Sequence, residues 1–106
     1  MVNSLNSILV EGKLIADPVM EDGVCDFRIE SVRTYMFGEE RKTEESIFPI
    51  TTRSRLAEVC GEYLKTGRGV RVVGRLRMVP EGNAEIVAEH VEFQPVRKSV
   101  PVAATA

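Results

Sequence analysis

Short apolar stretches alternate with compact polar turns along the chain, a pattern typical of a small all-β domain. The first stretch, 7–18, is rich in β-branched residues and carries Gly12 near its centre, where strands bulge or bend. A turn at 21–23 precedes a segment in which every second residue from Cys25 to Ile29 is apolar. This alternation predicts a strand with one face in the core.

Next comes a polar run, 38–46, which has too few apolar residues to pack and predicts a solvated, mobile loop between two strands. The segment 47–52 is β-rich again, but Pro49 lacks the N–H that a strand ladder needs. The sequence therefore predicts a strand at an edge, or one that places this nitrogen on its open side.

Helical periodicity is found in one segment, which predicts a helix of about three turns. Ser54 is in a position to cap its N-terminus and Gly67 to end it. Two further strands, 69–79 and 84–93, are predicted on either side of a compact turn at 80–83. The apolar stripe of the helix consists of Leu56, Val59, Cys60, Tyr63 and Leu64.

Five strands with one helix between the third and the fourth are the element order of an OB-fold, an all-β, five-stranded Greek-key barrel. The order alone leaves an SH3-like barrel open, and the position of the helix favours the OB-fold. We expect this domain to span 1–94. The short tail 95–106 contains two prolines and small residues, so we expect it to be disordered.

Composition and net charge limit the classes of function that this chain can have. At 106 residues, with 43% hydrophobic and 28% charged residues, the chain fits a single ordinary globular domain. No apolar run approaches the length of a membrane helix and the N-terminus lacks a basic signal region, so we expect a cytoplasmic protein without a membrane partner. The net charge of −2 excludes nucleic-acid binding through bulk positive charge. Any such binding has to come from a local patch.

Arginine and lysine side chains are concentrated in a few segments of the chain. Arg71, Arg75 and Arg77 share one parity on a predicted strand, so they face together. Others flank the helix, and the polar loop adds Arg41 and Lys42. The alternative is that these cations are solvated surface charges, partly paired with neighbouring carboxylates. The predicted phosphate contacts are Arg33, Arg53, Arg55, Lys65, Arg71, Arg75 and Arg77.

Several segments together resemble the bacterial single-stranded DNA-binding protein family over roughly positions 3–94: NSILVEGKLIADP, LAEVCGEYLKTG, and VRVVGRLR followed by AEHVEF. The helix segment is the most specific, and Gly12 and Gly74 lie where this family bends its barrel strands. The resemblance implies an OB-fold that binds single-stranded DNA without sequence preference, in DNA replication, recombination and repair. It also implies a homo-oligomer and no catalysis.

Binding a single strand requires cations for the phosphates and flat side chains on which bases stack. The resemblance places stacking positions at Tyr35, Ile47 and Arg53, of which Tyr35 alone is aromatic, and the loop at 80–83 supplies no further ring. Thr51 completes the predicted interface. With few stacking residues left, we expect weaker and more salt-sensitive binding than in a typical family member.

The remaining aromatic residues divide into two groups. Periodicity predicts that four of them are core residues, whereas Phe37, in the exposed loop, is either a stacking residue or a packing lid. His90 has no catalytic partner and receives no role. The predicted core aromatics are Phe27, Phe48, Tyr63 and Phe93.

Cofactors, metals and enzymatic activity are not expected. Cys25 and Cys60 are far apart and form no C-x-x-C pair, so we interpret both as small packing residues. No Ser/His/Asp set, metal-ligand spacing or phosphate-binding glycine loop is present.

The C-terminus differs from that of the family, whose members end in an acidic tip that recruits replication and repair enzymes. This sequence ends in PVAATA, without an acid after Glu92, so we do not expect recruitment by that route. We expect a tetramer joined by its first strands. A dimer stays open, because Arg71 takes an outward position near a subunit contact of family tetramers. The alternative function is a primosomal-type OB module that binds proteins and, weakly, DNA.

Overall fold

The computed structural model describes residues 2–95, which form six strands and one helix. The five long strands overlap the five stretches predicted to be strands, and the all-β class is confirmed, whereas the short strand at 19–21 was not predicted. The elements in chain order are β1 (Ile8–Leu14), β2 (Val19–Glu21), β3 (Val24–Phe37), β4 (Glu40–Arg53), α1 (Ser54–Tyr63), β5 (Gly69–Met78) and β6 (Ala84–Phe93).

Five of these strands close into a barrel in the order β1-β5-β6-β4-β3, and β1 pairs again with β3 to complete the circuit. Neighbours are antiparallel except β4 and β6, which pair in parallel at Ile50–Ile86 and Thr51–Val87. The three-residue strand β2 is added to β3 outside the barrel. The sequence predicted the helix directly after the third strand. Because β2 counts as a strand, the helix instead follows the fourth strand, β4.

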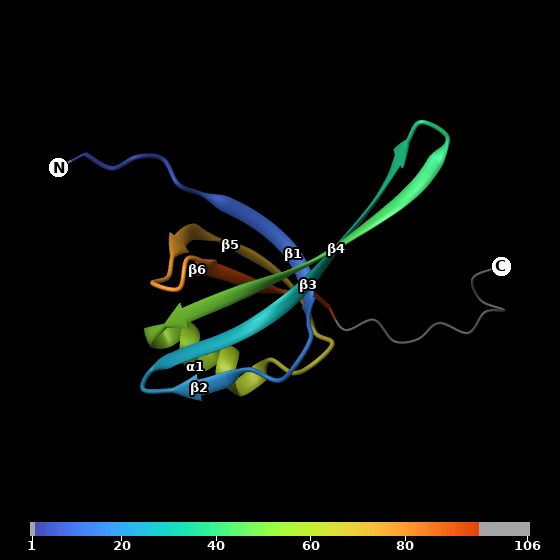
Figure 1. Ribbon diagram of the computed structural model, residues 1–106. Helices are drawn as coiled ribbons and strands as arrows, with labels where there is room; N and C mark the ends of the chain where they lie inside the picture. The colour runs from blue at the N-terminus through green and yellow to red at the C-terminus, as the bar shows by residue number, and fades with distance from the viewer. Residues whose placement is uncertain (1, 96–106) are drawn as a thin grey trace, which may run out of the picture.

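The core fills the interior of the barrel, where alternate residues of each strand point. On β3, Cys25, Phe27 and Ile29 are buried, as their spacing predicted. Helix α1 packs against β3 and β4 (Figure 1) and adds Ala57 and Cys60. The other fully or nearly buried apolar residues are Leu14, Ile50, Leu64, Val70, Val72, Ile86, Val87, Ala88 and Val91.

Both cysteines are packing residues, as predicted. Cys25 and Cys60 are unpaired and completely buried, and burial raises the pKa of the Cys60 thiol to about 12. The pKa of Cys25 is raised by the same cause. Thr52, also fully buried, donates a hydrogen bond from its hydroxyl to the carbonyl oxygen of Cys25 at 2.9 Å, so the polar atom in this part of the core is satisfied.

Three details of the helix differ from the prediction. Arg53 occupies the N-cap position without a side-chain hydrogen bond, whereas Ser54 has a φ of 58° and donates its backbone N–H to Gly23 at 3.2 Å. Gly67, with a φ of 88°, lies in the turn beyond the helix and bonds to Leu14. Tyr63, predicted to be core, is 59% exposed, because the helix turns this last position toward solvent.

At ten residues, α1 is too short to cross a membrane, and no other helix is present among residues 2–95.

Strands β3 and β4 extend well beyond the barrel as a two-stranded ribbon, residues 31–46, which projects from the body of the molecule (Figure 1). Pairing continues without interruption from Ser31–Ser46 to Phe37–Glu40. The prediction of a loop at 38–46 is therefore wrong for all but the turn at its start. The apolar pattern of a strand is missing because the ribbon has no core to face, while its backbone groups pair across the two strands.

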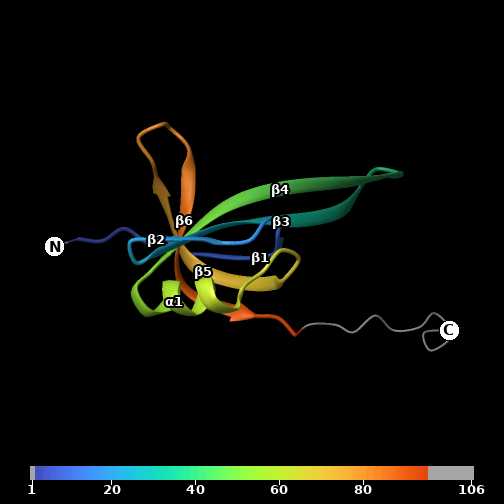
Figure 2. The same ribbon diagram turned by 90° about the horizontal axis from the view of Figure 1, so that it is seen from below.

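A second projection is the hairpin formed by β5 and β6, residues 74–88, which points in a different direction from the ribbon (Figure 2). It begins at a register shift between Val73 and Gly74, where β6 contains one extra residue, Glu89. A side chain on Gly74 would collide with the carbonyl of Val87, and one on Gly12 would lie 2.5 Å from the carbonyl oxygen of Glu30. Both glycines thus allow two strands to approach closely where the barrel wall bends.

Candidate nucleic-acid interface

One face of β4 points away from the core and carries three of the predicted site residues. Ile50 and Thr52 are buried inside the barrel, so Ile47, Thr51 and Arg53 face outward. Ile47 is 52% exposed, Arg53 is exposed, and Thr51 is buried between neighbouring strands. These three side chains share one surface because they have the same parity on the strand.

Closure of the barrel brings Arg75 to the same surface. Thr51 pairs with Val87 of β6, which in turn pairs with Arg75 of β5, so the three residues form one row on the outside of the sheet. Two strand spacings separate the ends of this row, about 10 Å. The row continues on the other side of Thr51 to Asp26 of β3. Thr51 and Arg75, which are 24 positions apart in sequence, thus lie on the two sides of Val87 of β6.

The two arginines of the hairpin differ in their partners. Arg77 donates a hydrogen bond from Nε to Glu85 Oε1 at 2.9 Å and forms an ion pair with the same carboxylate through its terminal nitrogen. Arg75 is exposed and has no ion-pair partner among residues 2–95. The charge of Arg75 is therefore available to a phosphate, whereas that of Arg77 is largely compensated.

Arg53 and Arg55 lie at the junction of β4 with the helix, both exposed. Neither makes an ion pair within the described chain, and they extend the outer face of β4 toward the end of the barrel that α1 covers. We call the surface formed by Ile47, Thr51, Arg53, Arg55 and Arg75 the outer β4 face.

Tyr35 and Arg33 do not lie on this surface. On the ribbon they share a parity with Phe27 and Ile29, so they occupy the face opposite to that of Ile47. The guanidinium carbon of Arg33 is 4.7 Å from the centroid of the Tyr35 ring. The carboxylate of Glu44, which lies diagonally across the ribbon, raises the pKa of the Tyr35 hydroxyl. The predicted stacking residue is therefore held between a cation and a carboxylate, away from the outer β4 face.

Arg71 is also separate, on the outside of the sheet formed by β1, β5 and β6. Its guanidinium is 3.0 Å from Glu11 and 3.9 Å from Glu92, the two residues opposite it on the neighbouring strands. The hydrogen bond to Arg71 lowers the pKa of Glu11, and that same contact raises the pKa of Arg71. Two carboxylates compensate this charge, so Arg71 fits the alternative of a paired surface cation.

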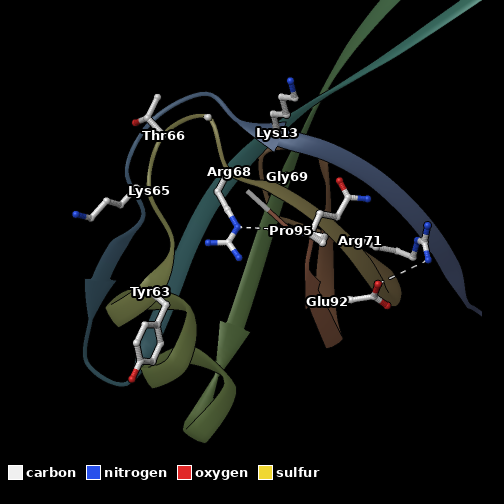
Figure 3. A pocket seen from close by; sticks show the side chains of 11 residues that line it. Lys13, Tyr63, Lys65, Thr66, Arg68, Gly69, Arg71, Glu92 and Pro95 are labelled. Carbon is white, nitrogen blue, oxygen red and sulfur yellow. Dashed lines mark hydrogen bonds and ion pairs between the residues drawn. The ribbon is translucent and has the colours of Figure 1, made fainter. Parts of the chain in front are cut away.

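Lys65 belongs to a groove between the end of α1 and the start of β5 (Figure 3). Arg68 points into the groove, donates a hydrogen bond from Nε to the carbonyl of Gln94 at 2.9 Å and lies 5.5 Å from the Phe93 ring, whereas Lys65 points away. Lys13 and Tyr63 complete its rim. Lys65 is thus placed apart from the outer β4 face.

Three residues of interest were not among the predicted site residues. Lys13 points outward from β1, and Arg68 lies in the turn after the helix. Once the barrel is known, the alternation of β1 and the position of the turn are enough to place both residues at the groove. Phe37 is 69% exposed on the ribbon. The sequence had left Phe37 open as a stacking residue or a packing lid, and it lies on the same strand as Tyr35, two residues away.

Among residues 2–95 no three His, Cys, Asp or Glu side chains are grouped in a way that could hold a metal ion. The predicted tail 95–106 lies, apart from Pro95, outside the described residues.

Comparison with known sequences gives consistent matches. A family model described as "Single-strand binding protein family" matches residues 5–94. The single-stranded DNA-binding protein of Caldanaerobacter subterraneus subsp. tengcongensis is 35% identical over 103 residues, covering 84% of this chain and 67% of the relative. That of Neisseria meningitidis serogroup A is 31% identical over 80 residues, 70% of this chain and 46% of the relative. The chain thus spans about two thirds of the length of the first relative and a little under half of the second.

Solved structures share the fold. A Plasmodium falciparum SSB in complex with ssDNA aligns with a TM-score of 0.78 at 20% identity, covering 90% of this chain and 99% of the other. The small single-stranded DNA-binding protein from Streptomyces coelicolor aligns with a TM-score of 0.73 at 24% identity, covering 89% and 96%. At this level of identity the likeness concerns the arrangement of the barrel.

Proposed function

This chain belongs to the single-strand binding protein family, and we propose that it binds single-stranded DNA without sequence preference through the outer β4 face. The observation that supports the proposal most directly is the row from Thr51 to Arg75, which sets an unpaired arginine beside the exposed face of β4. An OB-fold barrel binds oligonucleotides on this part of its surface, between its projecting loops.

The mechanism follows from the residue types. Arg53, Arg55 and Arg75 would contact phosphates, and Ile47 offers an apolar surface to a base. Arg77, held by Glu85, would position the hairpin rather than supply a full charge. Phosphate contacts carry no sequence information, which accounts for binding without sequence preference.

The ion pairs modify the expected salt dependence. A cation releases counterions from the DNA when it neutralises a phosphate, and each such contact contributes about −0.7 to the slope of log affinity against log salt for a single strand. Because carboxylates compensate Arg71 and Arg77, we propose a shallow slope together with weak binding. The stronger salt sensitivity that the loss of stacking residues suggested would require those arginines to be unpaired.

The edge of β1 supports assembly of more than one copy. Along Ile8–Lys13 this strand pairs with β5 on one side, but on the other side it reaches β3 only at Lys13 and Leu14 within the described residues. The open edge can pair with the same strand of a second copy. We propose a homo-oligomer, a tetramer with a dimer as the alternative, that acts without catalysis on single-stranded DNA of the nucleoid during replication, recombination and repair.

The alternative of a primosomal-type protein-interaction module is not favoured. The family model and the relatives described above all belong to single-strand binding proteins, and the outer β4 face offers unpaired cations for phosphates.

Titration of labelled oligothymidine at low and at moderate salt tests the proposal. We expect saturable binding at low salt, equal competition by unlabelled single strands of different sequence, and no competition by duplex DNA at the same concentration. Absence of binding at low salt would contradict the proposed function.

A further inference from the structure

We propose that Phe37 is a base-stacking residue, which acts together with Tyr35 on one face of the ribbon. This inference rests on the proposed single-stranded DNA binding and extends it to a second surface, separate from the outer β4 face. It also assigns a role to the one aromatic side chain for which the sequence left two interpretations open.

The register of the ribbon brings both rings to the same face. Tyr35 lies opposite Lys42 and Phe37 opposite Glu40, while the next row toward the barrel pairs Arg33 with Glu44. Two residues of one strand that share a face are about 7 Å apart. We call this surface the aromatic face of the ribbon; it consists of Arg33, Tyr35, Phe37, Glu40, Lys42 and Glu44.

Phe37 is open to solvent and is not a packing lid. The residue is 69% exposed, and no residue of the ribbon that carries it belongs to the hydrophobic core. An exposed aromatic side chain at the end of a projecting ribbon leaves a large apolar surface in water, which is unfavourable unless a ligand covers it.

Each ring has a cation over it. The Lys42 ammonium is 5.3 Å from the centroid of Phe37, and the Arg33 guanidinium carbon is 4.7 Å from that of Tyr35. A cation over one face of a ring leaves the opposite face for a base, and it stabilises the orientation of the ring at the same time. The two rings thus offer successive stacking surfaces along the ribbon.

The charges on this face favour stacking over phosphate binding. Arg33 and Lys42 are matched by Glu40, which is 3.7 Å from Lys42, and by Glu44, which lies opposite Arg33. Two cations and two carboxylates give no net attraction for a phosphate. Stacking on an aromatic ring depends on the π-face of any base, so the contribution of Phe37 to affinity should be independent of salt and of sequence.

The opposite face of the ribbon provides a matched control. Met36, the neighbour of Phe37, points to that face and is 62% exposed, nearly as much as Phe37. It has no aromatic ring, and neither do the other residues on its side, Val32, Thr34, Arg41, Thr43 and Glu45. A variant at Met36 changes ribbon surface to the same degree without touching a stacking residue.

Fluorescence can locate the strand, because the chain contains no tryptophan. Two variants, Phe37→Trp and Met36→Trp, each carry one reporter on one face of the ribbon. During titration with oligothymidine we expect quenching of the emission in Phe37→Trp and little change in Met36→Trp. Quenching of both reporters to the same degree, or of Met36→Trp alone, would overturn the assignment to the aromatic face.

Affinity gives the second measurement. Loss of one stacked base corresponds to a decrease of roughly fivefold to a hundredfold. We expect Phe37→Ala to bind oligothymidine more weakly by a factor in this range, with the same factor at low and at moderate salt, and Met36→Ala to bind like the wild type. Thermal unfolding of each variant checks that the ribbon change leaves the barrel folded.

The outcomes separate this inference from the proposed function. If the wild type binds and Phe37→Ala binds equally well, Phe37 is not a stacking residue, while the proposed function stands. If the wild type does not bind, the proposed function fails and this inference with it. Emission of Phe37→Trp that shifts with protein concentration in the absence of DNA would show that Phe37 contacts a second copy, which also overturns the inference.

Discussion

Strands β3 and β4 pair with each other over fourteen residue pairs, yet the two halves of this pairing differ in what the side chains do. In the barrel half, Ile29 and Ile50 are almost completely buried. In the ribbon half, no residue from 31 to 46 is buried, and Val32, Met36 and Phe37 are each more than half exposed. The backbone is a strand in both halves.

The difference shows that backbone pairing and core packing are separate sources of structure. In the barrel, side chains stabilise the fold and their identities are constrained by volume. In the ribbon, pairing alone maintains the strands, so the side chains are available for a ligand. The charges do not follow this division: Arg71, in the barrel wall, and Arg77, on the hairpin, are both paired with carboxylates, whereas Arg75, at the base of the hairpin, is unpaired in the described chain.

The largest effect is expected from a core truncation. Ile29→Ala removes a side chain with no exposure and should lower the free energy of unfolding by about 2–5 kcal/mol. Val32→Ala, three residues later on the same strand but 58% exposed, should change it by less than about 0.5 kcal/mol. Urea unfolding followed by circular dichroism measures both, and equal losses would remove the distinction between barrel and ribbon.

A smaller effect is expected where the barrel half of β3 meets the ribbon. Gly12→Ala places a Cβ atom 2.5 Å from the carbonyl oxygen of Glu30, and separating the two strands should cost about 1–3 kcal/mol. Gly61→Ala serves as control, since its Cβ would meet only the flexible end of Met20 at 3.2 Å and alanine favours a helix by up to about 1 kcal/mol. Opposite signs are expected in urea unfolding; a neutral Gly12→Ala would contradict the close approach.

The paired and unpaired arginines should differ in binding. Arg75→Gln removes one phosphate contact, so the slope of log affinity against log salt should become shallower by about 0.7. Over a fourfold increase in salt concentration, this difference in slope corresponds to a change of about 2.5-fold in affinity. Arg71→Gln, whose charge two carboxylates already compensate, should leave the slope nearly unchanged. Oligothymidine titrations over a salt series measure this. A larger effect of Arg71→Gln would indicate that DNA displaces its ion pairs.

The smallest effect concerns Tyr35 in the ribbon. The Glu44 carboxylate raises the pKa of Tyr35 above the ordinary value of 10, so the contribution of this interaction to stability is present below pH 10 and is lost as the pH rises through the higher, folded-state pKa. Tyrosinate absorbance in a Tyr63→Phe background isolates Tyr35. Glu44→Gln should lower the measured pKa toward 10; no change would mean that Glu44 does not act on Tyr35 in solution.

Much of the fold followed from local patterns. Alternation at 25–29 and the apolar stripe of the helix predicted elements correctly because both report which residues face a core. The loop predicted at 38–46 was wrong for the same reason, since a ribbon without a core has no apolar pattern. For the candidate site, the sequence predicts only which residues of one strand share a face, as Ile47 and Arg53 do. That Tyr35 lies on the opposite face from Ile47 depends on the register between β3 and β4, which no local pattern indicates.

The amino-acid sequence by itself determined where the helix and the core-facing parts of the strands form and which residues of each strand share a face, because backbone propensity and side-chain alternation act over a few residues. The tertiary structure decided which faces meet. The row from Thr51 to Arg75 exists only because β6 pairs with both β4 and β5, and Arg71 is compensated only because Glu11, 60 positions away, lies opposite it. Such neighbours arise from closure of the barrel, which depends on contacts between residues that are distant in sequence.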